Sequence, residues 1–192
     1  MGTTQPIKSM KELDDLKNFY LTKKPNLRNY ALICTGVNTA LRISDILGLT
    51  WEDVYDFHAK AFRNHIIIYE KKTGKQNMIA SNKSMIHGLQ LYMDSLCSVC
   101  PSHFIFAGRN ATLPLSRVQA FRIIKEACSQ LHLPDNISCH SLRKTFGYHA
   151  WVSGVSPAIL MIIYNHSSFQ VTKRYLGIEQ EDKDKVFLSL NL

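Results

Sequence analysis

Hydrophobic residues recur at helical spacing along most of the chain. In the run LRNYALICTGV, Leu27, Tyr30 and Val37 fall on one side of a helix, which is the pattern of a helix packed against a core. An earlier helix begins at Ser9, where Glu12 completes a capping box, and runs to about residue 23. Similar signals predict further helices at residues 43–49, 82–99, 116–131 and 138–152, after the Ser156-Pro157 cap, around Tyr175 and at 179–190.

The pattern changes between residues 54 and 81, where β-favouring residues replace helical spacing. The runs HIIIYE and QNMIAS are joined by KKTGKQ, in which Gly74 suits a tight hairpin turn. A chain of 192 residues is long enough to form one domain with a real core. We therefore predict a single mainly α domain over residues 1–192 with one small antiparallel β-sheet, an α+β fold.

Charge narrows the class of partner. The chain has 23 Lys and Arg against 15 Asp and Glu, a net charge of +8, which favours a polyanion such as nucleic acid. The longest apolar run, residues 159–164, is too short to cross a bilayer, and the start of the chain lacks a secretory signal. We expect a cytoplasmic protein with no membrane partner.

Cysteine usage gives little support to a metal site. The five cysteines cannot all pair, and we interpret them as reduced thiols. Cys97, Cys100 and His103 resemble half of a zinc site, but no second pair of ligands follows at the spacing of a zinc finger. We expect a helix end at this position and no metal.

Several polar residues stand where the chain is otherwise apolar. His140 and Arg143 are three residues apart and project from one face of a packed helix. Arg42 lies in an apolar stretch, and a guanidinium close to a core needs a partner. Asp45 could fix the direction of Arg42 or of a neighbouring histidine. Lys72 lies at the hairpin tip, where a solvated turn lysine is the simpler interpretation.

Four segments, in this order, resemble the catalytic domain of a tyrosine recombinase of the phage integrase family: TALRISDILGLTWEDV, EKKTGK, HSLRKTFGYHAW and NHSSFQVTKRYLGI. The likeness runs from about Lys11 to Phe187, and the complete ordered set is a stronger signal than any single motif. It implies the tyrosine-recombinase catalytic-domain fold and a site-specific recombinase or integrase that cleaves and religates DNA. The reaction is a transesterification without cofactor or metal, as in integration or excision of a mobile element or phage.

The resemblance also implies a role for each matched residue. Tyr175 is the expected nucleophile, which attacks a phosphodiester, forms a 3′-phosphotyrosine and releases a 5′-hydroxyl. Arg42 and Arg143 are expected to bind the two non-bridging oxygens, for which planar guanidinium groups are well suited. Asp45 is expected to orient the catalytic side chains without contacting the DNA itself.

Three further positions are expected to move protons or bind the phosphate. Lys72 matches the hairpin lysine that protonates the leaving 5′-oxygen, although Lys71 and Lys75 flank it and the assignment depends on the KTG match. His140 is expected to take the tyrosyl proton or to assist in its removal. His166 is expected to hydrogen-bond the phosphate.

Two features depart from the family pattern. The family often has Leu-Gly-His before the second histidine, whereas this chain has Tyr164, Asn165 and His166. Family members also commonly carry a core-binding domain, and integrases an arm-binding domain, and the residues before Lys11 can form neither. We expect an isolated catalytic domain or a naturally minimal member.

The resemblance implies partners as well. The expected partners are double-stranded DNA and other protomers of the same protein in a synaptic tetramer. The protomers are expected to dock through the tail after Tyr175. The protein is expected to be encoded by a bacterium or a phage and to associate with the nucleoid. A type IB topoisomerase shares the residue set but relaxes supercoils without strand exchange, and the short tail favours recombination. A DNA-binding regulator without catalysis is disfavoured, because it has no use for a tyrosine beside two phosphate-directed arginines.

Overall fold

The computed structural model describes residues 4–108, 110–178 and 180–190, and it confirms the prediction of a mainly helical α+β fold. Among these residues, no helix has the length and apolar character needed to cross a membrane. In chain order the elements are α1 (Met10–Thr22), α2 (Leu27–Asn38), α3 (Ile43–Ile46), α4 (Trp51–Val54), β1 (Tyr55–Asp56), β2 (Ala61–Phe62), β3 (His65–Tyr69), β4 (Gln76–Ala80), α5 (Lys83–Asp94), α6 (Arg117–Gln130), α7 (Cys139–Val152), α8 (Pro157–Tyr164), α9 (Phe169–Leu176) and α10 (Gln180–Ser189).

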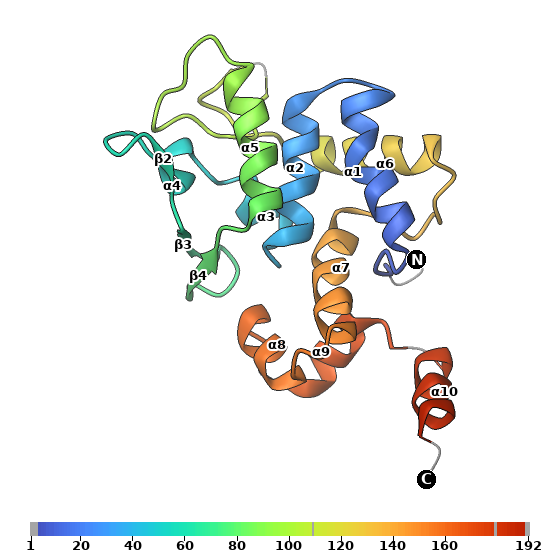
Figure 1. Ribbon diagram of the computed structural model, residues 1–192. Helices are drawn as coiled ribbons and strands as arrows, with labels where there is room; N and C mark the ends of the chain where they lie inside the picture. The colour runs from blue at the N-terminus through green and yellow to red at the C-terminus, as the bar shows by residue number, and fades with distance from the viewer. Residues whose placement is uncertain (1–3, 109, 179, 191–192) are drawn as a thin grey trace.

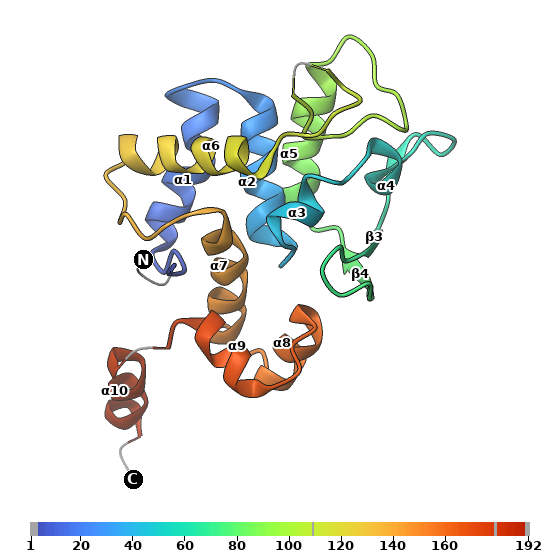
Figure 2. The ribbon, with the colours of Figure 1, turned by 180° about the vertical axis from the view of Figure 1, so that it is seen from behind.

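A helical body is built around α2. Figure 1 shows α2 between α1 and α5, and Figure 2 shows α6 crossing α1 and α2 on the opposite side. All residues from Asn29 to Val37 of α2 are buried, so this helix is the centre of the core. The side chains of Ser9, Asn26, Asn82 and Ser116 accept backbone N–H groups at the starts of α1, α2, α5 and α6.

The described residues form two β-hairpins, whereas the sequence predicted one sheet. β3 and β4 form the expected antiparallel pair, with Ile67 opposite Met78 and Tyr69 opposite Gln76. Gly74 in their turn has a φ of 65°, a conformation that favours glycine. The second hairpin pairs β1 with β2 over only two residues of each strand. The prediction of a single sheet is therefore wrong. The sequence did not reveal the second hairpin, because strands this short show no alternating pattern.

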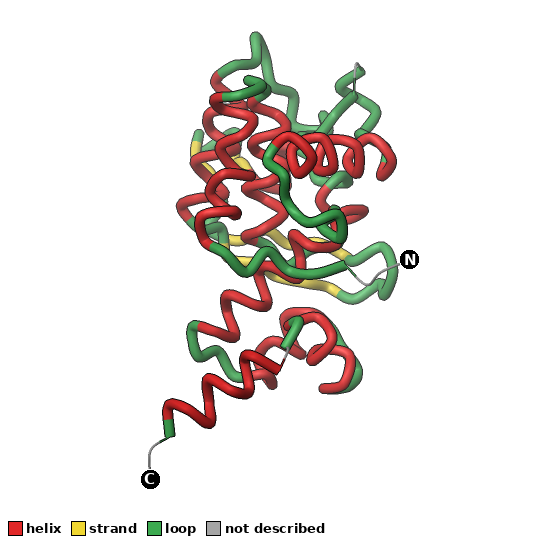
Figure 3. Tube along the Cα trace, turned by 90° about the vertical axis from the view of Figure 1, so that its right-hand side faces the viewer, coloured by secondary structure: helices red, strands yellow, loops and turns green. Residues whose placement is uncertain are grey.

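Helix α7 leads from the body to a smaller C-terminal group of helices. Figures 1 and 2 show α8 and α9 crossing the far end of α7, with α10 set apart from them. Figures 1 and 3 show the hairpin of β3 and β4 at the edge of the body that lies toward the C-terminal helices. A small core of Ala40, Leu160, Tyr164 and Leu176 joins these helices to the chain between α2 and α3. The long hairpin, α3 and α7–α9 thus meet in one region.

The segment before α1 fastens α7 to the end of α9. The Ile7 backbone N–H donates to Thr145 Oγ1 at 2.9 Å. Gly177 ends α9 with a φ of 59°, and a Cβ at this position would lie 2.8 Å from Pro6 Cδ. Both the backbone conformation and the close contact require glycine. The N-terminal segment therefore supports the helix that carries Tyr175.

Candidate active site

Arg42 and Glu70 form the first part of the candidate site. Arg42 is the N-cap residue of α3, and its Nη1 donates to Glu70 Oε2 at 2.5 Å. The Glu70 side chain is fully buried, whereas 19% of the Arg42 side chain is exposed. Burial by itself would raise the pKa of the Glu70 carboxyl, but hydrogen bonds from Asn165, Arg42 and Thr73 lower it below its ordinary value. Glu70 is therefore ionised at neutral pH and holds Arg42 through a charge-assisted hydrogen bond.

Asp45 supports the hairpin turn, whereas Glu70 is the carboxylate on Arg42. Asp45 Oδ1 accepts the backbone N–H of Lys71 at 3.0 Å, and Oδ2 is buried without a hydrogen-bond partner. The Lys71 ammonium lies over Gly48, where an added Cβ would be 2.9 Å from Nζ. Asp45 thus fixes the start of the turn, and Lys71 packs against the chain that follows α3.

Arg143 on α7 provides the second guanidinium of the site. The residue is 1% exposed, and its Nη2 donates to the Tyr164 carbonyl at 3.0 Å. Its Nε and Nη1 are buried with no hydrogen-bond partner. Burial, and then the positive charge of Arg42, lowers the pKa of Arg143, but an arginine stays protonated in proteins. A buried cation with two unpaired nitrogens, which carry three N–H groups, is costly to the fold, and an anion that accepts from them offsets the cost.

Tyr175 lies between two histidines. The centre of its ring is 4.9 Å from that of His140 and 4.6 Å from that of His166, both in edge-on contact. The Arg143 guanidinium carbon lies 5.7 Å from the centre of the Tyr175 ring. Tyr164 is fully buried and donates its hydroxyl to the Arg143 carbonyl at 2.8 Å, whereas Tyr175 is partly exposed. Of the two tyrosines, Tyr175 is the one accessible to a substrate.

Both histidines are neutral at pH 7. Packing on the inner side of His140, followed by the charges of nearby cations, lowers its pKa to about 4, although its outer side is exposed. In order of effect these cations are Lys144, Arg143, Arg42 and Lys72. Burial and neighbouring arginines also lower the pKa of His166 to about 4. His166 Nδ1 lies 3.0 Å from Thr172 Oγ1, a hydrogen bond that fixes the orientation of the ring.

Lys72 is exposed in the turn between β3 and β4. Its charge contributes to the lowered pKa of His140, so the hairpin holds its ammonium within electrostatic range of the site. Lys75 is also exposed, and its backbone N–H donates to Thr73 Oγ1 at 3.3 Å. Of the three hairpin lysines, Lys72 is the one whose charge contributes to the lowered pKa of His140, whereas the Lys71 ammonium lies close to Gly48.

A cavity of about 350 Å³ opens beside these groups. Three arginines, Arg42, Arg117 and Arg143, line it together with His140. The remaining lining residues are Ile43, Ser44, Phe121, Ser138 and Cys139. A cavity lined by three arginines suits an anion, and Arg143, whose Nε and Nη1 have no hydrogen-bond partner, is one of the three.

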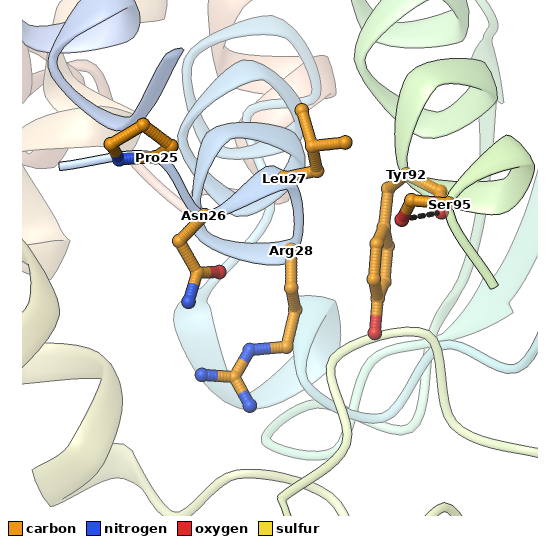
Figure 4. Close-up of a pocket in the computed structure, with 6 residues that line it drawn as sticks. All are labelled: Pro25, Asn26, Leu27, Arg28, Tyr92 and Ser95. Carbon is orange, nitrogen blue, oxygen red and sulfur yellow. Dashed lines mark hydrogen bonds between the residues drawn. The ribbon is translucent and has the colours of Figure 1, made fainter. Parts of the chain in front are cut away.

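A second cavity, of about 410 Å³, lies away from this chemistry. Figure 4 shows its lining, which comes from the start of α2 and from the end of α5. Its cation, Arg28, already donates to the Ala107 carbonyl at 2.7 Å and to Asn29 Oδ1. None of the residues expected from the sequence to act on DNA lines this cavity.

The part of the chain that the structure describes contains no group of three or more metal-binding side chains. Helix α5 ends at Asp94, five residues before its predicted end. Cys97 and Cys100 are exposed free thiols in the loop that follows. The end of the helix is thus earlier than the sequence pattern indicated.

The structure brings five of the expected residues into one region: Arg42, His140, Arg143, His166 and Tyr175. Lys72 is exposed in the hairpin turn beside this region. Asp45 binds the backbone of that turn. Sequence reasoning missed Glu70, Asn165 and Thr172. Asn165 ends α8 in the left-handed conformation, with a φ of 53°, and its Nδ2 donates to Glu70 Oε1 at 3.0 Å. Asparagine tolerates that conformation better than most residues, which was the one available signal. Glu70 and Thr172 gave none.

Comparison with known proteins adds independent information. The sequence profile of the phage integrase family matches residues 9–182. A protein called "Probable integrase/recombinase YoeC" from Bacillus subtilis is 36% identical over 181 residues, which cover 94% of this chain and 93% of that protein. The tyrosine recombinase XerD of Mycobacterium tuberculosis is 26% identical over 154 residues, 78% of this chain and 47% of XerD. The chain therefore spans nearly all of the first relative and about half of the second.

Solved structures show the same fold. The crystal structure of XerA recombinase superposes with a TM-score of 0.78 at 16% identity, covering 99% of this chain and 65% of that one. The Tn1549 transposon integrase in complex with a circular intermediate DNA gives a TM-score of 0.74 at 20% identity, covering 99% of this chain and 67% of that one. At these identities the likeness is one of fold.

Proposed function

The chain belongs to the phage integrase family, and we propose that it cleaves and rejoins double-stranded DNA in site-specific recombination, with Tyr175 as the nucleophile. The observation that carries this proposal is the state of Arg143. A guanidinium whose Nε and Nη1 are buried without a hydrogen-bond partner, next to a second arginine and a tyrosine, is suited to an anion with two acceptor oxygens. A phosphodiester has two such oxygens that take no part in its bonds to the sugars.

The chemical step follows from the order of these groups. The Tyr175 oxygen attacks the phosphorus, the bond from phosphorus to the 5′-oxygen breaks, and a 3′-phosphotyrosine remains. Arg42 and Arg143 stabilise the charge that develops on the non-bridging oxygens. Because one phosphoester replaces another, the free 5′-hydroxyl of a second strand reverses the step and rejoins the DNA.

The proton of Tyr175 goes to His140. The imidazole is neutral at pH 7 because packing and the surrounding cations lower its pKa to about 4, so it is able to accept a proton. A bound phosphate offsets the same cations, which raises the pKa of His140 toward its ordinary value and makes it a stronger base when the substrate is in place. His140 thus gains basicity only when DNA is bound.

Two further groups complete the reaction. With Thr172 donating its hydroxyl proton to His166 Nδ1, the other ring nitrogen of His166 carries a proton that it can donate to a phosphate oxygen. Lys72 protonates the departing 5′-oxygen, and the packing of Lys71 over Gly48 supports this choice among the hairpin lysines.

Partners are also part of the proposal. Several structural neighbours are described as bound to DNA, including XerH on its difH substrate and a lambda integrase dimer on a COC′ core site. Helix α10 exposes Val186, Phe187 and Leu188, an apolar surface that suits docking on another protomer in a synaptic tetramer. We place the protein in the cytoplasm, on nucleoid DNA.

The test is capture of the covalent intermediate. A randomised library of nicked duplexes, in which cleavage releases a short fragment and prevents religation, is incubated with the protein, and adducts that survive denaturant are sequenced. Wild type should yield adducts at one preferred sequence, and Tyr175→Phe none. Tyr148→Phe, which removes a hydroxyl from the buried face of α7, is the matched control and should react normally. Adducts in Tyr175→Phe, or their absence in wild type, would overturn the proposal.

A further inference from the structure

The Glu70 carboxylate is a junction of four hydrogen bonds. Oε2 accepts from Arg42 Nη1 at 2.5 Å and from Thr73 Oγ1 at 2.9 Å. Oε1 accepts from Asn165 Nδ2 at 3.0 Å and from Asn77 Nδ2 at 3.3 Å. The residue is 1% exposed. A buried carboxylate is tolerated when its lone pairs are filled in this way, so Glu70 is held rigidly and holds its partners in turn.

These partners belong to different parts of the site. Arg42 begins α3, while Thr73 and Asn77 belong to the hairpin that carries Lys72. Asn165 ends α8 and directly precedes His166. Among the described residues, the hydrogen bond from Asn165 to Glu70 is the one that joins residues 39–80 to α8 and α9. It links the first arginine and the hairpin to the helices that carry His166 and Tyr175.

Asn165 suits this link for two reasons. Its left-handed backbone ends α8 and turns the chain toward His166, a role usually filled by glycine. Its side chain adds an amide that glycine lacks, and the amide reaches back 95 residues to Glu70. Glycine would preserve the turn and remove only the link.

We infer that Glu70 is a positioning residue that fixes Arg42 and, through Asn165, sets the distance between the arginine–hairpin half of the site and the half that carries His166 and Tyr175. The expected effect of Glu70 on the rate of DNA cleavage rests on the proposed function. Its expected effect on the position of α8 and α9 rests on geometry alone. Glu70 itself does not contact the DNA phosphate, because its four contacts fill it and its charge would repel the phosphate.

The charge of Glu70 makes its role separable from simple support of the fold. Glu70→Gln removes a negative charge beside Arg42, so the site becomes more positive and should bind DNA at least as tightly. It also breaks the charge-assisted bonds that orient Arg42, and a misplacement of about 1 Å costs about 10²-fold in rate. We therefore expect unchanged or tighter DNA binding together with cleavage slower by about 10²-fold. Loss of the fold would weaken both.

Two amide variants isolate the link to α8. Asn165→Gly keeps the left-handed turn and removes the donor to Oε1, whereas Asn77→Ala removes the other donor to the same oxygen but stays within the hairpin. Single-turnover cleavage of the nicked duplex at saturating protein should fall by about 10-fold in Asn165→Gly and change by less than about 3-fold in Asn77→Ala. Binding is measured separately by titration of an uncleaved duplex.

Hydrogen exchange provides a readout that does not depend on activity. In Glu70→Gln without DNA, amides of residues 160–176 should exchange faster than in wild type, although the substitution lies far away in the sequence, and Asn77→Ala should leave them unchanged. Wild-type cleavage in Glu70→Gln, equal rates in the two amide variants, or unaltered exchange in α8 and α9 would each overturn the inference. Absence of adducts in wild type would instead refute the proposed function and leave the exchange result to decide the link.

Discussion

Replacing Arg143 by methionine should abolish DNA cleavage and leave the DNA-free fold about as stable as before. The two unpaired nitrogens of Arg143, Nε and Nη1, cost about 1–3 kcal/mol each, or about 2–6 kcal/mol together, and methionine removes that cost. The substitution also loses the bond from Nη2 to the Tyr164 carbonyl, which is worth about 1.5–3 kcal/mol. The contact between the guanidinium and the Tyr164 ring contributes about 0.5–2 kcal/mol more.

These contributions nearly cancel, so the free energy of unfolding of Arg143→Met should lie within about 2 kcal/mol of wild type. An arginine fully paired within the protein behaves differently, since breaking a buried ion pair costs about 3–5 kcal/mol. Lys144→Met is the matched control. Lys144 is the next cation on α7, is 4% exposed, and donates to the Thr4 carbonyl, so it supports the N-terminal segment.

Urea unfolding in a buffer free of phosphate and sulfate measures stability, and the nicked duplex measures cleavage. Sulfate, compared with chloride at equal ionic strength, should stabilise wild type and Lys144→Met more than Arg143→Met, because only the first two proteins keep the unpaired N–H groups that bind it. A loss of about 3 kcal/mol or more in Arg143→Met, with equal sulfate responses in all three proteins, would show that Arg143 is structural.

The remaining predictions concern the other groups of the site. Arg42→Ala should slow single-turnover cleavage by about 10²–10³-fold and Arg42→Lys should recover only part of it; a wild-type rate in Arg42→Ala would exclude phosphate binding by Arg42. Lys72→Ala should cleave ordinary DNA slowly and recover on a duplex with sulfur at the 5′-bridging position, because a thiolate leaves without a proton. Lys71→Ala should cleave both duplexes at the normal rate. Equal impairment of Lys72→Ala on both duplexes would exclude proton donation by Lys72. The pKa values of His140 and His166 fall from the ordinary 6.5 to about 4 on folding. Between pH 4 and 6.5 the unfolded chain therefore binds more protons than the folded protein. The free energy of unfolding should accordingly decline as the pH falls from 6.5 toward 4. Thermal melts of wild type and His140→Gln should show a shallower acid loss in the variant, and parallel curves would contradict the low pKa of His140.

The helices that begin with a side-chain cap were predictable because a cap is a local event. Ser9 caps α1 as predicted, and Asn82 and Ser116, the first residues of the predicted helices 82–99 and 116–131, cap α5 and α6. The hairpin of β3 and β4 was predictable for a similar reason, since Gly74 marks its turn. The hairpin of β1 and β2 was not, because two-residue strands owe their pairing to the surrounding fold.

The residues of the candidate site also divide into those that the sequence predicted and those that only the fold reveals. The resemblance to a family supplied Arg42, Arg143 and Tyr175 because their motifs are contiguous in the sequence. Glu70 could not be found from its own neighbourhood, since its partners Arg42 and Asn165 lie 28 and 95 residues away. Its position at the end of an exposed hairpin favoured a solvated side chain. In the folded protein, Arg42 at the start of α3 and Asn165 at the end of α8 both donate to this buried carboxylate.

The distance along the chain between Glu70 and Asn165 also bears on when the protein becomes able to cut DNA. Contacts that close a loop of 95 residues form late in folding, because the entropy of closure opposes them until other long-range contacts are made. Synthesis proceeds from the N-terminus, so both arginines are made before α9. Under the proposed mechanism, we therefore expect strand cleavage only from molecules in which the bond from Asn165 to Glu70 has formed and Tyr175 is in place.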